Sequence, residues 1–287
     1  MTNLFTIRAG NAELVLAPEM GGAVMSWTRG GKPMFRPPGE HPESPRDLAS
    51  YPLVPFSNRV AKRQFQFAGK IYHLPDLMRG QAIHGAGWQL PWTAQQDGTR
   101  ATLHLDYPGG DLWPFPFRSE QIFTLTEDAL VTEISITNLH NTPVPAGIGQ
   151  HPYFPRSAGA RLNFHAGHVW QHNDDKIPVH RSELGEWNHS EFQPVGPLDL
   201  DHCFGAWDGK ATLSYPDLGY TLTITADPIF THLIVFVPQG QSFFAVEPVS
   251  NMNDGLNRME AEPDHGVFIL VPGEKRSGMM TFRIGPV

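Results

Sequence analysis

Hydrophobic and polar residues alternate with a period of two over most of the chain, which is the pattern of β-strands that bury one face. Two pairs of such segments turn at a glycine and read as hairpins, 4–8 with 13–17 and 64–67 with 71–74. Further segments with this pattern lie at 101–107, 121–126, 130–138, 211–215, 220–225, 232–237, 243–247, 267–271 and 279–284. The pattern therefore predicts an all-β fold.

Helix signals are sparse. Only 255–262 has the character of a helix, with one or two turns that end before Pro263. Because strands and helices do not alternate, a doubly wound parallel sheet is disfavoured. Segments 31–55 and 165–200 interrupt the strand pattern as two long loops, but the composition is similar on either side of each. We therefore expect residues 1–287 to form a single domain that carries functional loops.

Composition limits the possible binding partners and the possible cellular compartment. The net charge is -8 and no basic stripe is visible, so nucleic acid is an improbable partner. The N-terminal residues lack a basic region followed by an apolar run, and no stretch reaches the ~18 apolar residues of a membrane span. The single cysteine, Cys203, excludes an internal disulfide and fits a buried side chain better than a nucleophile. These features predict a cytoplasmic protein that does not associate with membranes.

Four polar clusters stand apart within the strand pattern. They are 57–59, 83–85, 150–154 and 246–248, and together they contain an arginine, two histidines and a glutamate. Such distant residues can act together only if the fold gathers them. A histidine that faces a glutamate forms an acid/base pair that works near neutral pH, so the first hypothesis is a proton-transfer enzyme.

Each cluster also has an ordinary explanation. Gly85 and Gly87 beside His84 would let the backbone approach a ligand closely, but His84 could also be a surface histidine in a glycine-rich turn. His151 could be a hydrogen-bonded core histidine. Glu247 ends an apolar strand, which predicts a raised pKa and a general base, unless the side chain points to solvent. Asn58 and Arg59 can donate to hydroxyl or oxyanion groups, or Arg59 can pair with a surface acid.

A metal centre is not predicted. His165, His168 and His172 are close in sequence, but spacings of three and four place ligands on one face only in a helix, and this segment is not helical in pattern. No carboxylate completes the set. A metal-dependent cupin-like enzyme would need a close His-x-His pair, which is absent, and the chain has neither a nucleophile elbow nor a phosphate loop.

The clusters belong to a longer ordered series of short motifs. The series is Ser57-Asn58-Arg59-Val60, 67–74, Ile83-His84-Gly85 with Trp92, His151-Pro152-Tyr153-Phe154, Asp201-His202-Cys203-Phe204, Val246-Glu247-Pro248 and Val271-Pro272-Gly273-Glu274. In content and order the series resembles the aldose 1-epimerase, or galactose mutarotase, family. The resemblance covers most of the chain.

This resemblance implies a large antiparallel β-sandwich, a supersandwich, whose groove binds a sugar, and a cofactor-free interconversion of α and β anomers. By resemblance, Glu247 is the base that takes the proton of the C1 hydroxyl, and His151 is the acid that protonates the ring oxygen. His84 and Arg59 would bind near the anomeric centre, with Asn58 beside them, and Asp201 would hold sugar hydroxyls. The groove lies within one chain, which implies a monomer or a weak homodimer.

The chain departs from galactose mutarotases at 76–82, where these carry an asparagine and a longer glycine-rich stretch. Arg79 in this run could meet an anionic substituent, which favours a charged sugar such as a hexose 6-phosphate as the alternative substrate. Other basic candidates are Arg36, Lys62, Arg63 and Arg156. A third hypothesis is a non-catalytic sugar-binding or sensing module, because fold does not dictate function.

Overall fold

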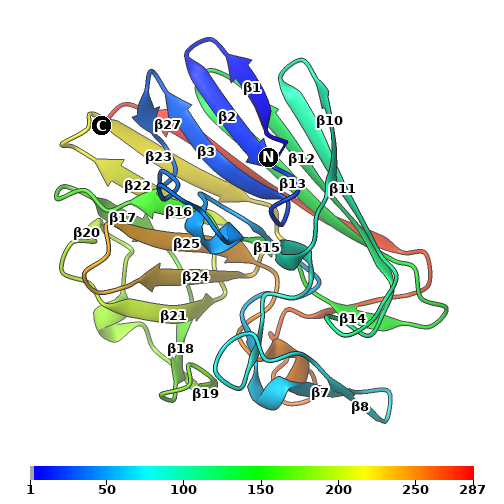
Figure 1. Ribbon diagram of the computed structural model, residues 1–287. Helices are drawn as coiled ribbons and strands as arrows, with labels where there is room; N and C mark the ends of the chain where they lie inside the picture. The colour runs from blue at the N-terminus through cyan, green and yellow to red at the C-terminus, as the bar shows by residue number, and fades with distance from the viewer. Residues whose placement is uncertain (1–2) are drawn as a thin grey trace.

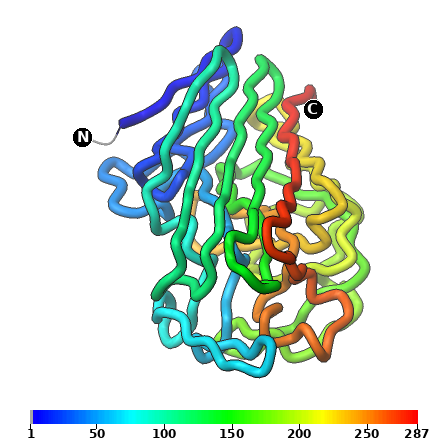
Figure 2. Tube along the Cα trace, turned by 90° about the vertical axis from the view of Figure 1, so that its right-hand side faces the viewer, coloured from blue at the N-terminus to red at the C-terminus, as the bar shows by residue number. Residues whose placement is uncertain are grey.

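The computed structural model describes residues 3–287, and its two largest sheets face each other (Figure 1). The nine-stranded sheet runs in the order β10 (Thr93–Asp97), β11 (Arg100–Tyr107), β12 (Phe117–Leu125), β13 (Ala129–Asn138), β27 (Lys275–Gly285), β23 (Tyr220–Ala226), β22 (Lys210–Tyr215), β17 (Arg161–Phe164) and β20 (Gln193–Pro194). Figure 2 shows the C-terminal strand β27, in red, lying along the green β13 with which it pairs.

The eight-stranded sheet carries most of the site. It runs β19 (Pro178–Ser182), β18 (His168–His172), β21 (Leu200–Gly205), β24 (His232–Val237), β25 (Phe243–Val249), β15 (Gly149–Gln150) and β5 (Pro52–Leu53), with β16 (Tyr153–Pro155) also paired to β25. Antiparallel pairing places Asp201 opposite Phe236 and Glu247 opposite Ile234. Side chains from three neighbouring strands therefore reach one face of the sheet.

Smaller sheets complete the molecule. The first hairpin extends into a four-stranded sheet of β1 (Phe5–Ala9), β2 (Ala12–Ala17), β3 (Ala23–Arg29) and β4 (Lys32–Pro33). The two-stranded sheets are β6 (Arg59–Val60) with β9 (Ala82–Ile83), β7 (Gln64–Phe67) with β8 (Lys70–His73), and β14 (Val144–Ala146) with β26 (Phe268–Leu270). Both predicted hairpins are confirmed.

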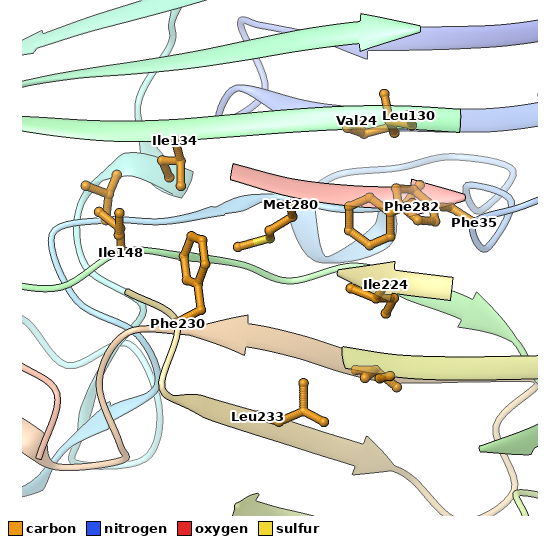
Figure 3. Close-up of a cluster of buried hydrophobic side chains, with 14 of the residues drawn as sticks. Val24, Phe35, Leu130, Ile134, Ile148, Ile224, Phe230, Leu233, Met280 and Phe282 are labelled. Atoms are coloured by element: carbon orange, nitrogen blue, oxygen red, sulfur yellow. The ribbon is translucent and has the colours of Figure 1, made fainter. Parts of the chain in front are cut away.

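The core fills the space between the large sheets. Figure 3 shows Leu130 of β13, Phe282 of β27 and Leu233 of β24 in one cluster, which thus receives side chains from both sheets. Phe35 packs edge-on against Phe282, with ring centroids 5.1 Å apart, and against Phe154 at 5.4 Å. The alternating burial along β12 and β27 is what the period-two pattern predicts. The expected all-β antiparallel sandwich is confirmed.

Helical structure is limited to single 3-10 turns in the described part of the chain. They are η1 (Pro45–Asp47), η2 (Ala61–Arg63), η3 (Gly87–Gln89), η4 (Gly185–Trp187) and η5 (Gly255–Asn257). The helix expected at 255–262 begins at the predicted residue but is one 3-10 turn followed by hydrogen-bonded turns. Among residues 3–287 there is no helix with the length and apolar character needed to cross a bilayer.

The interpretation of 165–200 as a loop is wrong, because this segment contains β18, β19, β20 and η4. These strands are short, β19 and β20 lie at sheet edges, and a register shift interrupts β18 between Gln171 and His172. Edge strands are half solvated and bulges break the alternation, so the period-two signal is weak there. The other predicted loop, 31–55, is mainly irregular apart from η1 and the two-residue strands β4 and β5.

Candidate active site

The four polar clusters meet at one pocket of about 200 Å³. Its lining consists of Arg46, Tyr51, Asn58, Arg59, Met78, Ile83, His84, His151, Tyr153, Asp201, Ile234, Phe236 and Glu247. Strand pairing explains the convergence, since β6 pairs with β9 and brings Arg59 opposite Ile83, next to His84. A wider cleft of about 570 Å³ lies beside the β7–β8 hairpin, but the facing histidine and glutamate lie in the smaller pocket.

His151 and Glu247 form a buried pair. His151 Nε2 lies 3.1 Å from Glu247 Oε1, and only 7% and 2% of the two side chains are exposed. Burial raises the pKa of the Glu247 carboxyl well above its usual range, and the charge of Asp201 adds to this while Arg59 opposes it. Burial, assisted by Arg36 and Arg46, lowers the pKa of His151 well below its usual range. Both pKa shifts favour the neutral forms of the two side chains, which share one proton between Oε1 and Nε2.

Each member of the pair keeps one polar atom unused. Glu247 Oε2 and His151 Nδ1 are buried and have no hydrogen-bond partner among residues 3–287. A buried polar atom without a partner costs about 1–3 kcal/mol, so it is retained where a ligand can satisfy it. Glu247 lies inside β25 rather than at its end, since the strand continues to Val249. The raised pKa expected for this carboxyl nevertheless agrees with its buried position.

His84 is held in a single orientation by Asn58. The His84 N–H donates to Asn58 O at 3.0 Å, and the Asn58 N–H donates to His84 Nδ1 at 3.2 Å. Because Nδ1 accepts, the proton of the neutral ring belongs to Nε2. Burial lowers the pKa of His84 well below its usual range, which keeps the ring neutral. Both residues have positive φ, 61° for His84 and 55° for Asn58, a strained conformation that often marks functional sites.

Gly85 and Gly87 were expected to let a ligand approach the backbone closely. The structure assigns their small size to packing instead, because a Cβ on Gly85 would lie 2.5 Å from Val54 O and one on Gly87 would lie 2.4 Å from Val54 Cγ1. Gly85 also has φ of 71°, which glycine adopts without strain. The two glycines therefore fix the path of the chain behind His84.

Arg59 faces Asp201 across the pocket. Arg59 Nη2 lies 3.7 Å from Asp201 Oδ2, and Asn58 Oδ1 accepts from the Arg59 N–H at 2.8 Å and from Nη1 at 3.3 Å. On the other side, Tyr51 stacks on His151 with ring centroids 4.6 Å apart, and Tyr153 lies at 4.5 Å. Burial raises the pKa of Tyr153 to about 12, so its hydroxyl stays protonated. The site thus combines polar donors and acceptors with an aromatic wall.

The predicted site residues Asn58, Arg59, His84, Asp201, His151 and Glu247 all line the pocket. Arg79 is exposed and lies outside this lining, although the preceding Met78 belongs to it. Arg36 and Arg156 donate to backbone carbonyls, and Lys62 and Arg63 are exposed. No group of three or more potential ligands able to hold a metal occurs in 3–287.

Arg46 and Tyr51 are polar lining residues that the sequence did not single out, and both lie in the loop 31–55. The capping pattern Ser44-Pro45-Arg46-Asp47 signals a short turn but does not say which surface that turn will face. Tyr51 immediately precedes β5, whose two residues are too few for a periodicity. Only the folded chain reveals that both residues border the His–Glu pair.

The protein is a large antiparallel β-sandwich of the galactose mutarotase-like fold, and it carries a buried His–Glu pair in a polar and aromatic pocket. Residues 3–283 match the family described as aldose 1-epimerase, and the chain belongs to this family. The uncharacterised YphB of Escherichia coli K12 is 28% identical over 98% of both chains. A crystal structure of a proposed aldose 1-epimerase from Escherichia coli K12 superposes with a TM-score of 0.91 at 26% identity, covering 100% of both chains.

The fold also extends to distant relatives. The structure of a GalM/aldose epimerase homologue from C. elegans has a TM-score of 0.85 at 16% identity and covers 100% of both chains. At this identity the likeness concerns the fold alone.

Proposed function

We propose that the protein is an aldose 1-epimerase that interconverts the α and β anomers of an aldose by acid/base ring opening and closure. The observation that carries the proposal is the buried contact of 3.1 Å between His151 Nε2 and Glu247 Oε1, with one further polar atom of each group without a hydrogen-bond partner in the described residues. Membership in the aldose 1-epimerase family supports the same chemistry.

In the proposed reaction, Glu247 takes the proton of the C1 hydroxyl through its free Oε2 while protonated His151 gives a proton to the ring oxygen. The bond between C1 and the ring oxygen breaks, and the C1 carbonyl forms. Rotation about C1–C2 presents the other face of the aldehyde to the C5 hydroxyl. Closure then reverses the roles, since Glu247 returns its proton to the C1 oxygen and His151 recovers one from the C5 hydroxyl.

The proton count of the pair fits this sequence. Before ring opening the shared proton passes from Glu247 to His151 across their 3.1 Å contact, and after ring opening Glu247 again holds one proton. The second state is the neutral pair, which the burial of both groups favours. Burial of the site therefore stabilises the protonation state that accompanies the open-chain aldehyde, and each half-reaction regenerates the state needed by the other.

The remaining residues bind and orient the sugar in this proposal. His84 Nε2–H donates to an oxygen near C1, because Asn58 fixes the tautomer that places the proton on Nε2. Arg59 donates to a neighbouring hydroxyl, and Asp201 accepts from sugar hydroxyls. Arg79 stays a prediction, because its side chain is exposed and lies outside the pocket lining, next to the lining residue Met78.

NMR exchange between anomers of glucose and galactose tests the proposal. We expect the wild-type protein to accelerate exchange, and Glu247→Gln to lose about 10²–10⁴-fold, the usual contribution of a general base. Exposed Glu191→Gln is the matched control and should retain full activity. Sugar binding without acceleration for any neutral or anionic aldose would instead support a non-catalytic sugar-binding module.

A further inference from the structure

Arg46 places a charge in the pocket that no acidic side chain balances. Its guanidinium is half-buried, it forms no ion pair with an acidic group among residues 3–287, and its buried Nη2 has no hydrogen-bond partner there. Arg59, the other arginine of the pocket, faces Asp201 at 3.7 Å. The two arginines therefore differ, because one is neutralised and the other is available to a ligand.

The nearest acid in sequence, Asp47, is occupied by the backbone. Its Oδ2 accepts from the N–H groups of Ser44 at 3.0 Å and Glu43 at 3.1 Å, and the Arg46 N–H donates to Ser44 Oγ at 3.2 Å. This capping box holds η1 in place, and Arg36 braces it by donating to the carbonyl oxygen of Arg46. The turn thus presents Arg46 on a rigid support, while the Asp47 carboxylate is bound to the backbone and forms no ion pair with Arg46.

The guanidinium is also oriented by an aromatic ring. The Cζ of Arg46 lies 4.7 Å from the ring centroid of Trp88, a cation–π distance. A planar guanidinium held on one face keeps its edge N–H groups for a second partner, and this edge geometry matches a carboxylate or a phosphate. Stacking on Trp88 therefore reduces the freedom that Arg46 would otherwise lose on binding an anion.

The charged side chains that line the pocket carry one positive charge in excess. The His151–Glu247 pair shares a single proton and is neutral overall, while burial keeps His84 neutral. Arg59 and Asp201 cancel each other, which leaves Arg46. A neutral aldose would bury this charge with only hydroxyl groups to meet it, whereas an anionic group would neutralise it.

Aromatic rings connect Arg46 to the histidine of the acid/base pair. Trp88, which carries the Arg46 guanidinium, lies 5.8 Å from Tyr51 between ring centroids, and Tyr51 stacks on His151 at 4.6 Å. An anion held by Arg46 would therefore lie in the same pocket as the His151–Glu247 pair.

Building on the proposed function, we infer that Arg46 binds an anionic substituent of the sugar, so that the protein selects aldoses with a carboxylate or a tetrahedral oxyanion over neutral aldoses. Arg46 is then a specificity-determining residue of the same pocket. Glucuronate and glucose 6-phosphate represent the two anion geometries, and glucose is their neutral counterpart.

The test measures equilibrium binding and anomer exchange by NMR for these three sugars. For the wild-type protein we expect binding of at least one anionic sugar to be tighter than that of glucose by about 10- to 100-fold, which is the range for hydrogen bonds to a charged group. Arg46→Gln should abolish this preference, and Arg46→Lys should retain part of it because the charge remains. Exposed Arg100→Gln, on β11, is the matched control and should keep the wild-type preference.

Two outcomes would overturn the inference. One is a wild-type protein that binds glucose as tightly as both anions. The other is a preference that survives Arg46→Gln but disappears in Arg79→Gln, which would place the anion at Arg79. If only the proposed function is wrong, the protein will not accelerate anomer exchange of any sugar. Anionic sugars will nevertheless bind the wild-type protein more tightly than they bind Arg46→Gln. Thermal unfolding of each variant establishes that it is folded.

Discussion

Gly85→Ala should destabilise the protein and displace His84, because the site depends on a backbone position that accepts no side chain. A Cβ at Gly85 would lie 2.5 Å from Val54 O and 2.6 Å from Val54 C. These are backbone atoms of a buried segment and cannot move aside like the end of a flexible side chain. The φ of 71° adds a conformational cost for alanine.

The magnitude follows from two separate contributions. A left-handed conformation costs alanine about 1–2 kcal/mol, and forcing atoms into a packed region costs about 1–3 kcal/mol more. We therefore expect Gly85→Ala to lower the free energy of unfolding by about 2–5 kcal/mol. Gly80 is the matched control, since its φ is 87° and a Cβ there would meet nothing within 4 Å.

Urea unfolding of the two variants separates the contributions. Gly80→Ala should show only the conformational cost, and the difference between the variants should equal the steric cost of about 1–3 kcal/mol. Anomer exchange should fall in Gly85→Ala alone, because the chain next to His84 must shift. Equal losses of stability in both variants, with equal activity, would refute the assigned role of Gly85.

Three further predictions concern charge. Asp201→Asn should shift the acidic limb of the exchange rate to lower pH and Arg59→Ala should shift it to higher pH, because Asp201 raises and Arg59 lowers the pKa of Glu247. Glu247→Gln should unfold at a higher urea concentration than the wild type at neutral pH, because a carboxyl whose pKa is raised by folding destabilises the folded state when it must ionise. This gain should vanish as the pH falls toward about 4.3, the pKa of the glutamate in the unfolded chain. Burial lowers the pKa of His232 to about 4, whereas a histidine in the unfolded chain has a pKa of about 6.5. The free energy of unfolding should therefore fall by about 3 kcal/mol as the pH drops from the second value to the first. Urea unfolding of His232→Gln should show a smaller loss over the same pH range.

The alternation of side chains was sufficient to predict the β-fold wherever a strand buries one face. β12 alternates between buried and partly exposed positions, and the hairpins β1–β2 and β7–β8 turn at glycines with positive φ. The signal failed for β18, β19 and β20, where partly solvated or irregular strands lack a regular apolar face. Local sequence patterns indicate which face of a strand is buried, and an edge strand without a regular apolar face gives only a weak pattern.

The candidate site was predictable as a set of residue types, since a histidine, a glutamate and an arginine in motifs of fixed order suggested the chemistry. Their proximity was decided by strand register, which places Glu247 opposite Ile234 and Arg59 opposite Ile83. The sequence favoured Arg79 as the basic residue for an anion, whereas the folded chain brings Arg46 into the pocket.

The sequence by itself therefore determined the β-class, the hairpins and the candidate acid/base residues, because these depend on local alternation and on side-chain chemistry. Only the tertiary structure decided which groups are desolvated, which tautomer His84 adopts and which arginine is left without a counter-charge. Those properties depend on neighbours contributed by distant segments, such as Asn58 beside His84 and Trp88 beneath Arg46.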